Sequence, residues 1–385
     1  MHNRSAAVVK NASSRLGWPL TLASAFALTI VSFTVWGFGT MVFHPKGVDF
    51  VSFWAAGRMV AGGHAVQAYD ILAHRRVELA VAPDTGLMPF PYPPPFLALM
   101  APLAMLPFTV AFIVWVLLTG GLYAASARRL APLPYVLANP SVLVDAMIGQ
   151  TGLLAGALII AGAIALAETP FAGGVLFGLM IFKPQLAVML PVALLAGRQW
   201  RAIAGAALSS ISLVLLGLIL FGPSAYAGFF HMLSHYAGYL RQARWNWIEL
   251  ASPFAFARYF GVPQSISLGI QLICAFAAAS LTWAAWWQNW QTKIPILACA
   301  TLLASPYLFT YDAVLMIVPA ACFLAERRYW LTGFLWLLCA LPVAHFFDLY
   351  QGPNTIPLAA GGSLILLAGR SGVFQWNRSP VAVRG

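Results

Sequence analysis

Charged residues are scarce in this chain of 385 residues: 8% are Asp, Glu, Lys or Arg, whereas 61% are hydrophobic. A soluble domain carries roughly 25% charged residues, because its surface must be hydrated. Long apolar stretches recur from one end of the chain to the other, and the mean hydropathy is +0.82. The composition therefore excludes a soluble enzyme held by a single anchor and predicts an integral membrane protein.

The chain also lacks the motifs of several chemistries. It has no Walker loop, GxSxG elbow, HExxH pair or dinucleotide-binding fingerprint, so ATP-driven transport by this chain alone is unsupported. Its four cysteines lie in apolar runs, without a CxxC pair or metal-ligand spacing, and we expect them to be buried thiols. We therefore expect no cofactor and no metal.

Positive charge exceeds negative charge by a formal +11, but the basic residues come in short clusters between apolar runs. This distribution is typical of membrane topology and not of a nucleic-acid-binding stripe. The clusters at turns are Arg128–Arg129, Arg198 with Arg201, Lys293 and Arg327–Arg328. They fall on the cytoplasmic side, together with both termini, if the chain crosses the membrane about 10–12 times.

Two long polar segments, at about 44–95 and 222–263, then share the extracytoplasmic side, where we expect the function to lie. The predicted fold is a single domain over 1–385, an all-α membrane bundle with interfacial helices in both inserts. The first apolar run, Trp18–Phe43, is too long for a signal peptide and is expected to be a retained span. Several runs between 139 and 197 are shorter than the ~20 residues of a full crossing, which is tolerated around an enclosed cavity.

Only ten residues are acidic, and Asp49 is notable among them because it follows the first span and precedes the aromatic stretch Phe50–Trp54. Desolvation beside such a stretch raises the proton affinity of a carboxylate, which suits a base that takes a proton from a hydroxyl. An aspartate directly before an apolar helix is also a common N-cap. Position alone leaves both interpretations open.

Two basic residues stand in unusual places. Lys183 lies between Ile181-Phe182 and Leu186, where a lysine at membrane depth should face a cavity and a partner, for which a phosphate is suitable. The alternative is a lysine that extends to the membrane interface. Arg58 puts positive charge on the extracytoplasmic side, where it either contacts a lipid phosphate or solvates an interfacial helix.

The later polar residues are less specific. Arg244 and Trp245 in the second insert could bind a phosphate and stack on a sugar, or could belong to an interfacial aromatic belt. Asp312 follows Tyr311 at the end of an apolar run, where it either caps the next helix or holds part of a polar site.

The order of short motifs along the chain is informative. Asp49-Phe50 is followed by Phe53-Trp54-Ala55-Ala56, Tyr69-Asp70, Tyr92-Pro-Pro-Pro-Phe96, Gly149-Gln150, Lys183-Pro184-Gln185 and Ser305-Pro306…Asp312. This order resembles the family 87 glycosyltransferases, a multispan group that includes mycobacterial mannosyltransferases of phosphatidylinositol mannosides. The resemblance covers roughly 49–312, and the motifs are specific by their order and spacing together.

The resemblance implies a GT-C fold, with a cavity open to the extracytoplasmic side and a polyprenyl-phosphate sugar as donor. It also implies an inverting, metal-independent transfer with Asp49 as the base. Lys183 would contact the donor phosphate with Gln150 nearby, and Arg58 or an arginine of the second insert could assist. Members near the mycobacterial enzymes tend to carry histidine after the Ser-Pro pair, whereas this chain has Tyr307 to Asp312, and this departure leaves the choice of sugar and acceptor open.

The sequence thus predicts a glycosyltransferase of the bacterial inner membrane. It would move a hexose, with mannose expected first, from a polyprenyl-phosphate donor to an extracytoplasmic lipid or glycan acceptor. Its partners would be the donor, the acceptor and membrane lipids, but no nucleic acid. Asp312, Tyr311, Arg244 and Trp245 are candidates for acceptor or sugar binding. A transporter or flippase of a polyprenyl-linked or lipid substrate is the alternative, and a noncatalytic scaffold is a third hypothesis.

Overall fold

The computed structural model describes residues 23, 24, 26, 49–242 and 246–370. Within these ranges the regular secondary structure is helical, apart from one isolated bridge between Leu250 and Phe309. The prediction of an all-α membrane protein is confirmed for this part of the chain. The predicted first span, Trp18–Phe43, lies almost wholly outside the described residues.

Short helices dominate the first half of the fold. In chain order they are α3 (Phe50–Ala61), η1 (Val66–Tyr69), α4 (Ile71–Val81), α5 (Pro94–Leu103), α6 (Phe108–Ala127), α7 (Leu133–Leu137), α8 (Pro140–Ile148), α9 (Gly152–Ala165), α10 (Pro170–Gly178), η2 (Leu179–Phe182), α11 (Pro184–Ala187) and α12 (Met189–Ala196).

Longer helices occur in the second half. They and the short elements between them are α13 (Trp200–Gln242), α14 (Asn246–Glu249), α15 (Pro253–Tyr259), α16 (Gln264–Trp287), α17 (Lys293–Ala304), η3 (Thr310–Met316), α18 (Ile317–Ala325), α19 (Tyr329–Ala344), η4 (His345–Phe347) and α20 (Ile356–Ala368). The main packed pairs are α10 with α13, α16 with α17, α6 with α9, α3 with α5 and α17 with α20.

Four helical stretches of the described chain are long and apolar enough to cross a membrane. They are Phe108–Ala127, Trp200–Tyr236, Gln264–Trp287 and Tyr329–Phe347. Eight further apolar helices are 10–17 residues long, which is below the ~20 residues of a full crossing. The bundle is therefore built largely from half-length helices, as the interrupted apolar runs of the sequence predict.

Proline positions explain where several of the short helices begin. Pro140, Pro170 and Pro184 each occupy the first turn of a helix, namely of α8, α10 and α11. Proline suits this position because its missing N–H would have no partner there and its φ is already helical. The same residues restrict the backbone before them, so each proline ends one segment and starts the next.

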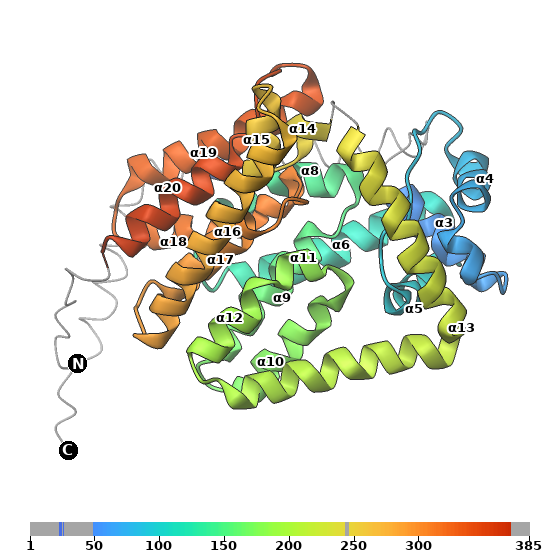
Figure 1. Ribbon diagram of the computed structural model, residues 1–385, viewed down its shortest axis with the longest axis horizontal. Coiled ribbons are helices and arrows are strands. Elements are labelled where there is room, and N and C mark those ends of the chain that lie inside the picture. The colour runs from blue at the N-terminus through green and yellow to red at the C-terminus, as the bar shows by residue number, and fades with distance from the viewer. Residues whose placement is uncertain (1–22, 25, 27–48, 243–245, 371–385) are drawn as a thin grey trace.

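The longest helix, α13, is divided into two arms at Gly222, which has φ 73° and ψ 173° and is followed by Pro223. In Figure 1 the first arm runs along the lower edge of the molecule and the second arm rises from the lower right toward the top, with α3 and α4 to its right. The bend at Gly222 and the start of α16 at Gln264 coincide with the predicted limits of the second polar insert.

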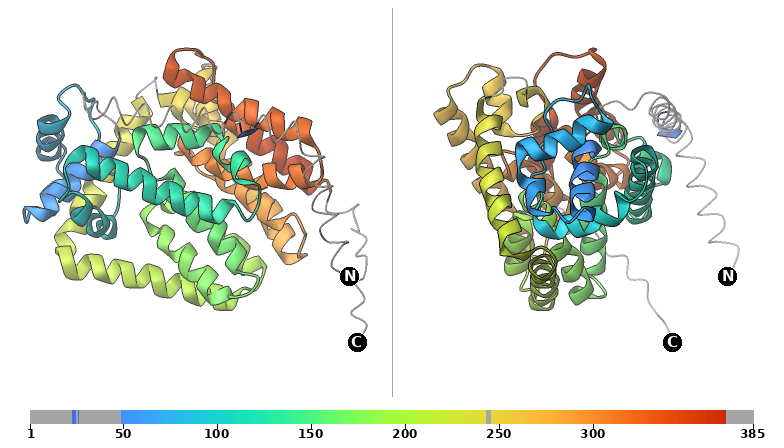
Figure 2. Two further views of the ribbon diagram at one scale, coloured as in Figure 1. Left: turned by 180° about the vertical axis from the view of Figure 1, so that it is seen from behind. Right: turned by 90° about the vertical axis from the view of Figure 1, so that its right-hand side faces the viewer.

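Two of the basic turns lie at a different end of the molecule from the helices of the polar inserts. Figure 1 shows the α12–α13 and α16–α17 turns at the lower left, whereas α3 and α4 lie at the upper right and α14 at the top. The view from behind in Figure 2 shows the same separation. Arg198 and Lys293 are therefore at one end of the bundle, as the charge distribution predicts.

An aromatic core connects α3 to α5 and α6. Phe53 meets the ring of Tyr92 edge-on at 5.0 Å, and Tyr92 stacks on Phe96 at 4.7 Å. Phe50 packs edge-on against Phe112 at 5.6 Å and is fully buried. Each buried aromatic ring removes a large apolar area from solvent, so the residue directly after Asp49 is firmly anchored.

Candidate active site

A cavity of about 360 Å³ lies where the start of α3, the 87–93 segment, the second arm of α13 and the 307–311 segment meet. A volume of roughly 300–1,000 Å³ is usual for sites that bind small molecules. The polar lining includes Asp49, Gln150, Lys183, Gln185, Glu249, Tyr92, Tyr236, Tyr307 and Tyr311. Carboxylate, ammonium and amide groups thus converge on one enclosed space from elements far apart in the sequence.

The Asp49 carboxylate points to this cavity and does not cap a helix. Asp49 occupies the N-cap position of α3, but its side chain makes no capping hydrogen bond there. Its Oδ2 instead accepts a hydrogen bond of 2.8 Å from Gln150 Nε2. Asp70 provides the contrast, because its Oδ1 accepts a 2.7 Å hydrogen bond from the Ala73 N–H at the start of α4. The N-cap interpretation therefore holds for Asp70 and not for Asp49.

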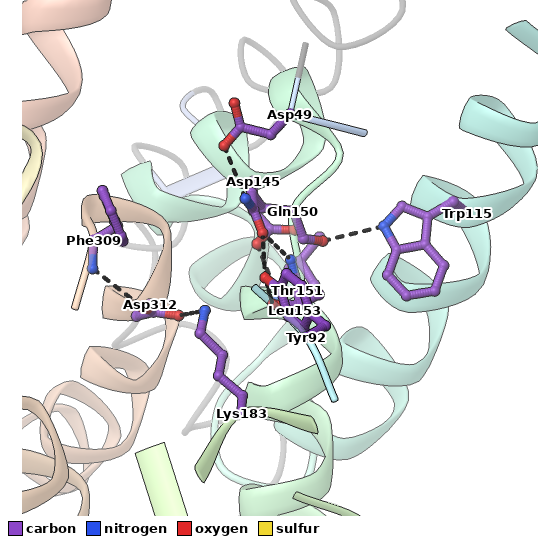
Figure 3. Close-up of polar contacts among 10 residues, drawn as sticks. All are labelled: Asp49, Tyr92, Trp115, Asp145, Gln150, Thr151, Leu153, Lys183, Phe309 and Asp312. Atoms are coloured by element: carbon purple, nitrogen blue, oxygen red, sulfur yellow. Dashed lines mark hydrogen bonds and ion pairs between the residues drawn. The ribbon is translucent and has the colours of Figure 1, made fainter. Parts of the chain in front are cut away.

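Hydrogen bonds from three directions orient Gln150. Its Oε1 accepts from the Tyr92 hydroxyl at 3.0 Å and from the Thr151 N–H at 3.1 Å. Its backbone carbonyl accepts from Trp115 Nε1 at 3.2 Å. Because Oε1 is engaged by two donors, the amide NH₂ must face Asp49, as Figure 3 shows. Gln150 is thus a fixed donor to the carboxylate.

Gly149 allows this close approach. Its φ of +69° is in the left-handed region, and a Cβ at this position would lie 2.7 Å from both the Phe50 Cβ and the Phe112 ring. A side chain would therefore push α3 and α6 away from the turn that carries Gln150. The Gly149-Gln150 pair of the sequence has a physical basis: the glycine permits the contact and the glutamine makes it.

We expect Gly149→Ala to destabilise the protein by about 2–4 kcal/mol, since it combines left-handed strain with overpacking. The matched control is Gly120→Ala in α6, where a Cβ would meet nothing within 4 Å and where alanine should be neutral or stabilising by about 0.5–1 kcal/mol. Thermal unfolding of both variants in the same detergent measures the difference. Equal melting temperatures would show that the close approach is not required.

Lys183 lies opposite these groups and is buried, with a side chain that is 2% exposed. Its Nζ is 2.5 Å from Asp312 Oδ1 and 4.6 Å from the centre of the Tyr311 ring. The alternative of a lysine that extends to the interface is therefore wrong. The side chain instead brings a positive charge to the cavity wall, where an ion pair and an aromatic face compensate the charge.

Asp312 has both of the roles that the sequence left open. Its Oδ2 accepts from the Phe309 N–H at 3.1 Å, which caps η3, and its Oδ1 holds Lys183. Asp312 is buried behind the lysine and is not part of the cavity lining. Figure 3 shows Asp312 between Phe309 and Lys183, while Asp49 and Gln150 approach from a different element.

This arrangement of a hydrogen-bonded carboxylate and a buried lysine in one cavity can be compared with known families. The sequence model of glycosyltransferase family 87 matches residues 90–306, which is more than half of the chain. The chain belongs to glycosyltransferase family 87. No curated protein and no solved structure matches it. The resemblance inferred from the order of motifs is thereby confirmed.

As a family 87 glycosyltransferase, the protein acts on a sugar donor and an acceptor. The matched range contains Gln150, Lys183 and Glu249, whereas Asp49 and Asp312 lie outside it. The structure brings Asp49 and Gln150 together across the boundary of this range. The cavity is therefore the natural candidate for the active site of this family 87 member.

Other residues named from the sequence lie elsewhere. Arg58 is exposed near the end of α3, with its guanidinium 5.6 Å from the Trp54 ring centre. It follows Asp49 by nine positions, and at ~100° per residue this places it on the opposite side of the helix. Arg58 is not among the cavity residues. Arg244 and Trp245 lie outside the described residues.

A buried polar cluster supports the rim of the cavity and was not anticipated. Ser52, which lines the cavity, has its hydroxyl 3.3 Å from His74 Nε2 and donates to the Pro89 carbonyl at 3.1 Å. His74 Nε2 lies 3.4 Å from Glu78, which also pairs with Arg75. These contacts bind α4 to α3 and to the 85–89 segment. In sequence the same residues look like the polar face of an interfacial helix.

Proposed function

We propose that this glycosyltransferase moves a hexose, with mannose expected first, from a polyprenyl-phosphate donor to an extracytoplasmic lipid or glycan acceptor. The observation that carries the proposal is one cavity lined by both Asp49 and Lys183. Family membership favours transfer over the alternative of a transporter or flippase. The proposed architecture is a GT-C membrane domain of the bacterial inner membrane. The cavity would face the extracytoplasmic side because α3 and α14, which contribute to its lining, lie away from the α12–α13 and α16–α17 turns.

In this proposal Asp49 is the base. Burial raises the pKa of the Asp49 carboxyl above its ordinary value, while the Gln150 hydrogen bond and the charge of Lys183 act in the opposite direction. A raised proton affinity suits removal of a proton from an acceptor hydroxyl in the transition state. The hydroxyl oxygen forms a bond to the anomeric carbon as the carbon–phosphate oxygen bond breaks, and Asp49 keeps the proton. One displacement from the opposite face inverts the anomeric configuration.

The leaving group determines what the rest of the site must supply. A phosphate departs as an anion, so it needs positive charge and no second carboxylic acid to protonate it. Glycoside hydrolases, by contrast, use two carboxyl groups, one of which protonates the leaving group. In this proposal Lys183, which lines the cavity, provides the positive charge. Ammonium or guanidinium groups stabilise such developing charge in a dry site by electrostatics alone.

The direct test is transfer by the purified full-length chain in lipid nanodiscs. The donors are radiolabelled polyprenyl-phosphate mannose, then the glucose and galactose analogues, with a membrane lipid extract as acceptor. We expect a labelled lipid product whose new anomeric bond is inverted relative to the donor, as shown by NMR. Product from a nucleotide sugar but from no polyprenyl-phosphate sugar would reject the donor class. Retention of configuration would reject the single displacement.

The Gln150 hydrogen bond gives a prediction about pH. Transfer requires ionised Asp49, so the rate should fall as the pH drops through the pKa of Asp49. Gln150→Leu removes a donor that stabilises the ionised form, which raises this pKa further. We expect the acidic limb of kcat/KM to move to higher pH by about one unit. Gln185→Leu, which changes a cavity residue without that bond, is the control and should leave the limb in place. If the acidic limb stays at the same pH in both variants, the Gln150 hydrogen bond does not set the pKa of the base.

A further inference from the structure

A second carboxylate lies in the cavity, and the proposed reaction does not use it. Glu249 ends α14 and lines the same space as Asp49 and Lys183. Its backbone is held in place, because its carbonyl accepts from Thr310 Oγ1 at 3.2 Å and from Asn354 Nδ2 at 3.2 Å. These backbone contacts fix the position of the residue, and they do not use its side-chain carboxylate.

The Glu249 carboxylate is short of hydrogen-bond donors. No side chain or backbone N–H in the described part of the chain donates to it, and partial burial with the nearby charge of Asp49 raises its pKa to about 7. A half-buried carboxylate that has few donors gains free energy when a ligand supplies them. Sugar hydroxyls are donors, and a ligand that brings them into the cavity would satisfy this group.

The cavity also has a cationic end and an anionic end. Lys183 Nζ lies over the Tyr311 ring, which stacks on Phe309 at 5.4 Å with the ring planes 11° apart. Phe309 pairs by its backbone with Leu250, the residue after Glu249. The lysine therefore adjoins the Tyr311 side of the aromatic pair, and the chain segment that carries Glu249 adjoins the Phe309 side. Asp49 is within electrostatic reach of both charged groups.

This order of charges assigns the two substrates to different ends. A donor phosphate is attracted to Lys183 and repelled by Glu249, so it should occupy the lysine end. The acceptor then occupies the remaining space, beside Asp49 and Glu249. Phe309 offers that space an apolar ring face, and carboxylate groups with aromatic faces suit a sugar ring, which has hydroxyls at its edge and C–H groups on its faces.

We propose that Glu249 is a specificity residue that binds a non-reacting hydroxyl of a carbohydrate acceptor, whose neighbouring hydroxyl is presented to Asp49. This inference rests on the proposed function. It defines the acceptor class as a neutral, polyhydroxylated ring with at least two hydroxyls near the reaction centre. An acceptor with a phosphate at that end would be disfavoured by two carboxylates. Glu249 acts by binding and takes no proton from the reacting oxygen.

The test uses the full chain in nanodiscs, with polyprenyl-phosphate mannose as donor and octyl α-mannoside and its monodeoxy analogues as acceptor probes. We expect Glu249→Ala, which removes both acceptor oxygens, to raise the acceptor KM about 30-fold, the usual effect of losing a hydrogen bond to a charged group, with kcat and donor KM within threefold of wild type. Wild type should discriminate against one monodeoxy analogue by a similar factor. Glu249→Ala should treat this analogue and the parent sugar alike.

Two further variants keep the result interpretable. Glu249→Asp retains the charge and should recover part of the lost affinity, while Glu168→Ala makes the same change at an exposed glutamate in the α9–α10 turn and should behave as wild type. An unchanged acceptor KM in Glu249→Ala would overturn the inference, as would a loss of kcat alone, which would make Glu249 a base. Absence of transfer by the wild-type protein from every donor would reject the proposed function itself, and this inference with it.

Discussion

Asp49→Asn is expected to lower the turnover of sugar transfer by about 10³-fold, within the range found when a general base is removed. Asparagine has the shape of aspartate and can still accept the hydrogen bond from Gln150 Nε2, but it cannot take a proton. The protein should therefore fold as wild type and bind its donor. Donor KM should stay the same or fall, because a negative charge near the phosphate has been removed.

The matched control is Asp70→Asn, which makes the same chemical change in the same polar segment. Asp70 caps α4, and asparagine is as good an N-cap as aspartate, so this variant should keep wild-type turnover. Both variants are assayed with radiolabelled polyprenyl-phosphate mannose, and their melting temperatures are compared. Turnover above a tenth of wild type in Asp49→Asn would remove Asp49 from the role of base. Glu249 would then be the other carboxylate of the cavity to test.

The breaks between helices could be predicted because their causes are local. Pro170 and Pro184 limit the backbone of their own segments, and Gly222 with Pro223 divides α13 whatever its surroundings. The distribution of Lys and Arg along the sequence similarly predicts that basic turns and polar inserts lie apart. The number of full membrane crossings could not be predicted from the sequence, because short apolar helices and complete spans have the same composition.

The candidate site was predictable to the extent that its polar residues interrupt apolar runs. Asp49, Gln150 and Lys183 are conspicuous for that reason, but their partners depend on the fold. Gln150 meets Asp49 across 101 positions of sequence, and Lys183 meets Asp312 across 129. No local pattern reports such pairings. The two interpretations of Asp312 therefore stayed open until the structure showed that each carboxylate oxygen has its own partner.

Glu249 and His74 were missed for the opposite reason. Both lie in polar segments, where a charged or titratable residue is ordinary and predicts a solvated face. His74 is buried and Glu249 half-buried because distant segments pack against them: α3 with the 85–89 segment beside His74, and the 307–311 segment beside Glu249. Arg58 is the opposite case, a residue that the sequence suggested for the site and that the structure places outside the cavity. Its positive charge is conspicuous in the sequence, but the turn of α3 carries it away from the cavity.

The buried pair of Lys183 and Asp312 makes the second large prediction. Lys183→Met should destabilise the protein by about 3–5 kcal/mol, since it leaves a buried carboxylate without its partner. It should also lower transfer by about 10²–10³-fold, because the donor phosphate loses its positive charge. A loss of activity in this single variant would not by itself distinguish poor folding from a missing phosphate contact.

The double variant Lys183→Met with Asp312→Asn separates the two effects. Asparagine can still accept from the Phe309 N–H, and no uncompensated charge remains, so the stability of the double variant should return close to that of wild type. Its transfer should stay as low as in Lys183→Met, with a raised donor KM. Asp312→Asn alone keeps the lysine and should retain donor binding, with KM unchanged or lower because the lysine is no longer paired.

These three variants are compared by thermal unfolding in detergent and by donor titration in nanodiscs. Recovery of transfer together with stability in the double variant would show that Lys183 only supports the fold, and the phosphate would have to be held elsewhere. Recovery of stability without transfer would place the lysine in the donor site. Because Asp312 fixes both the lysine and the Phe309 turn, the same carboxylate would then position the donor end of the cavity and one wall of the acceptor end.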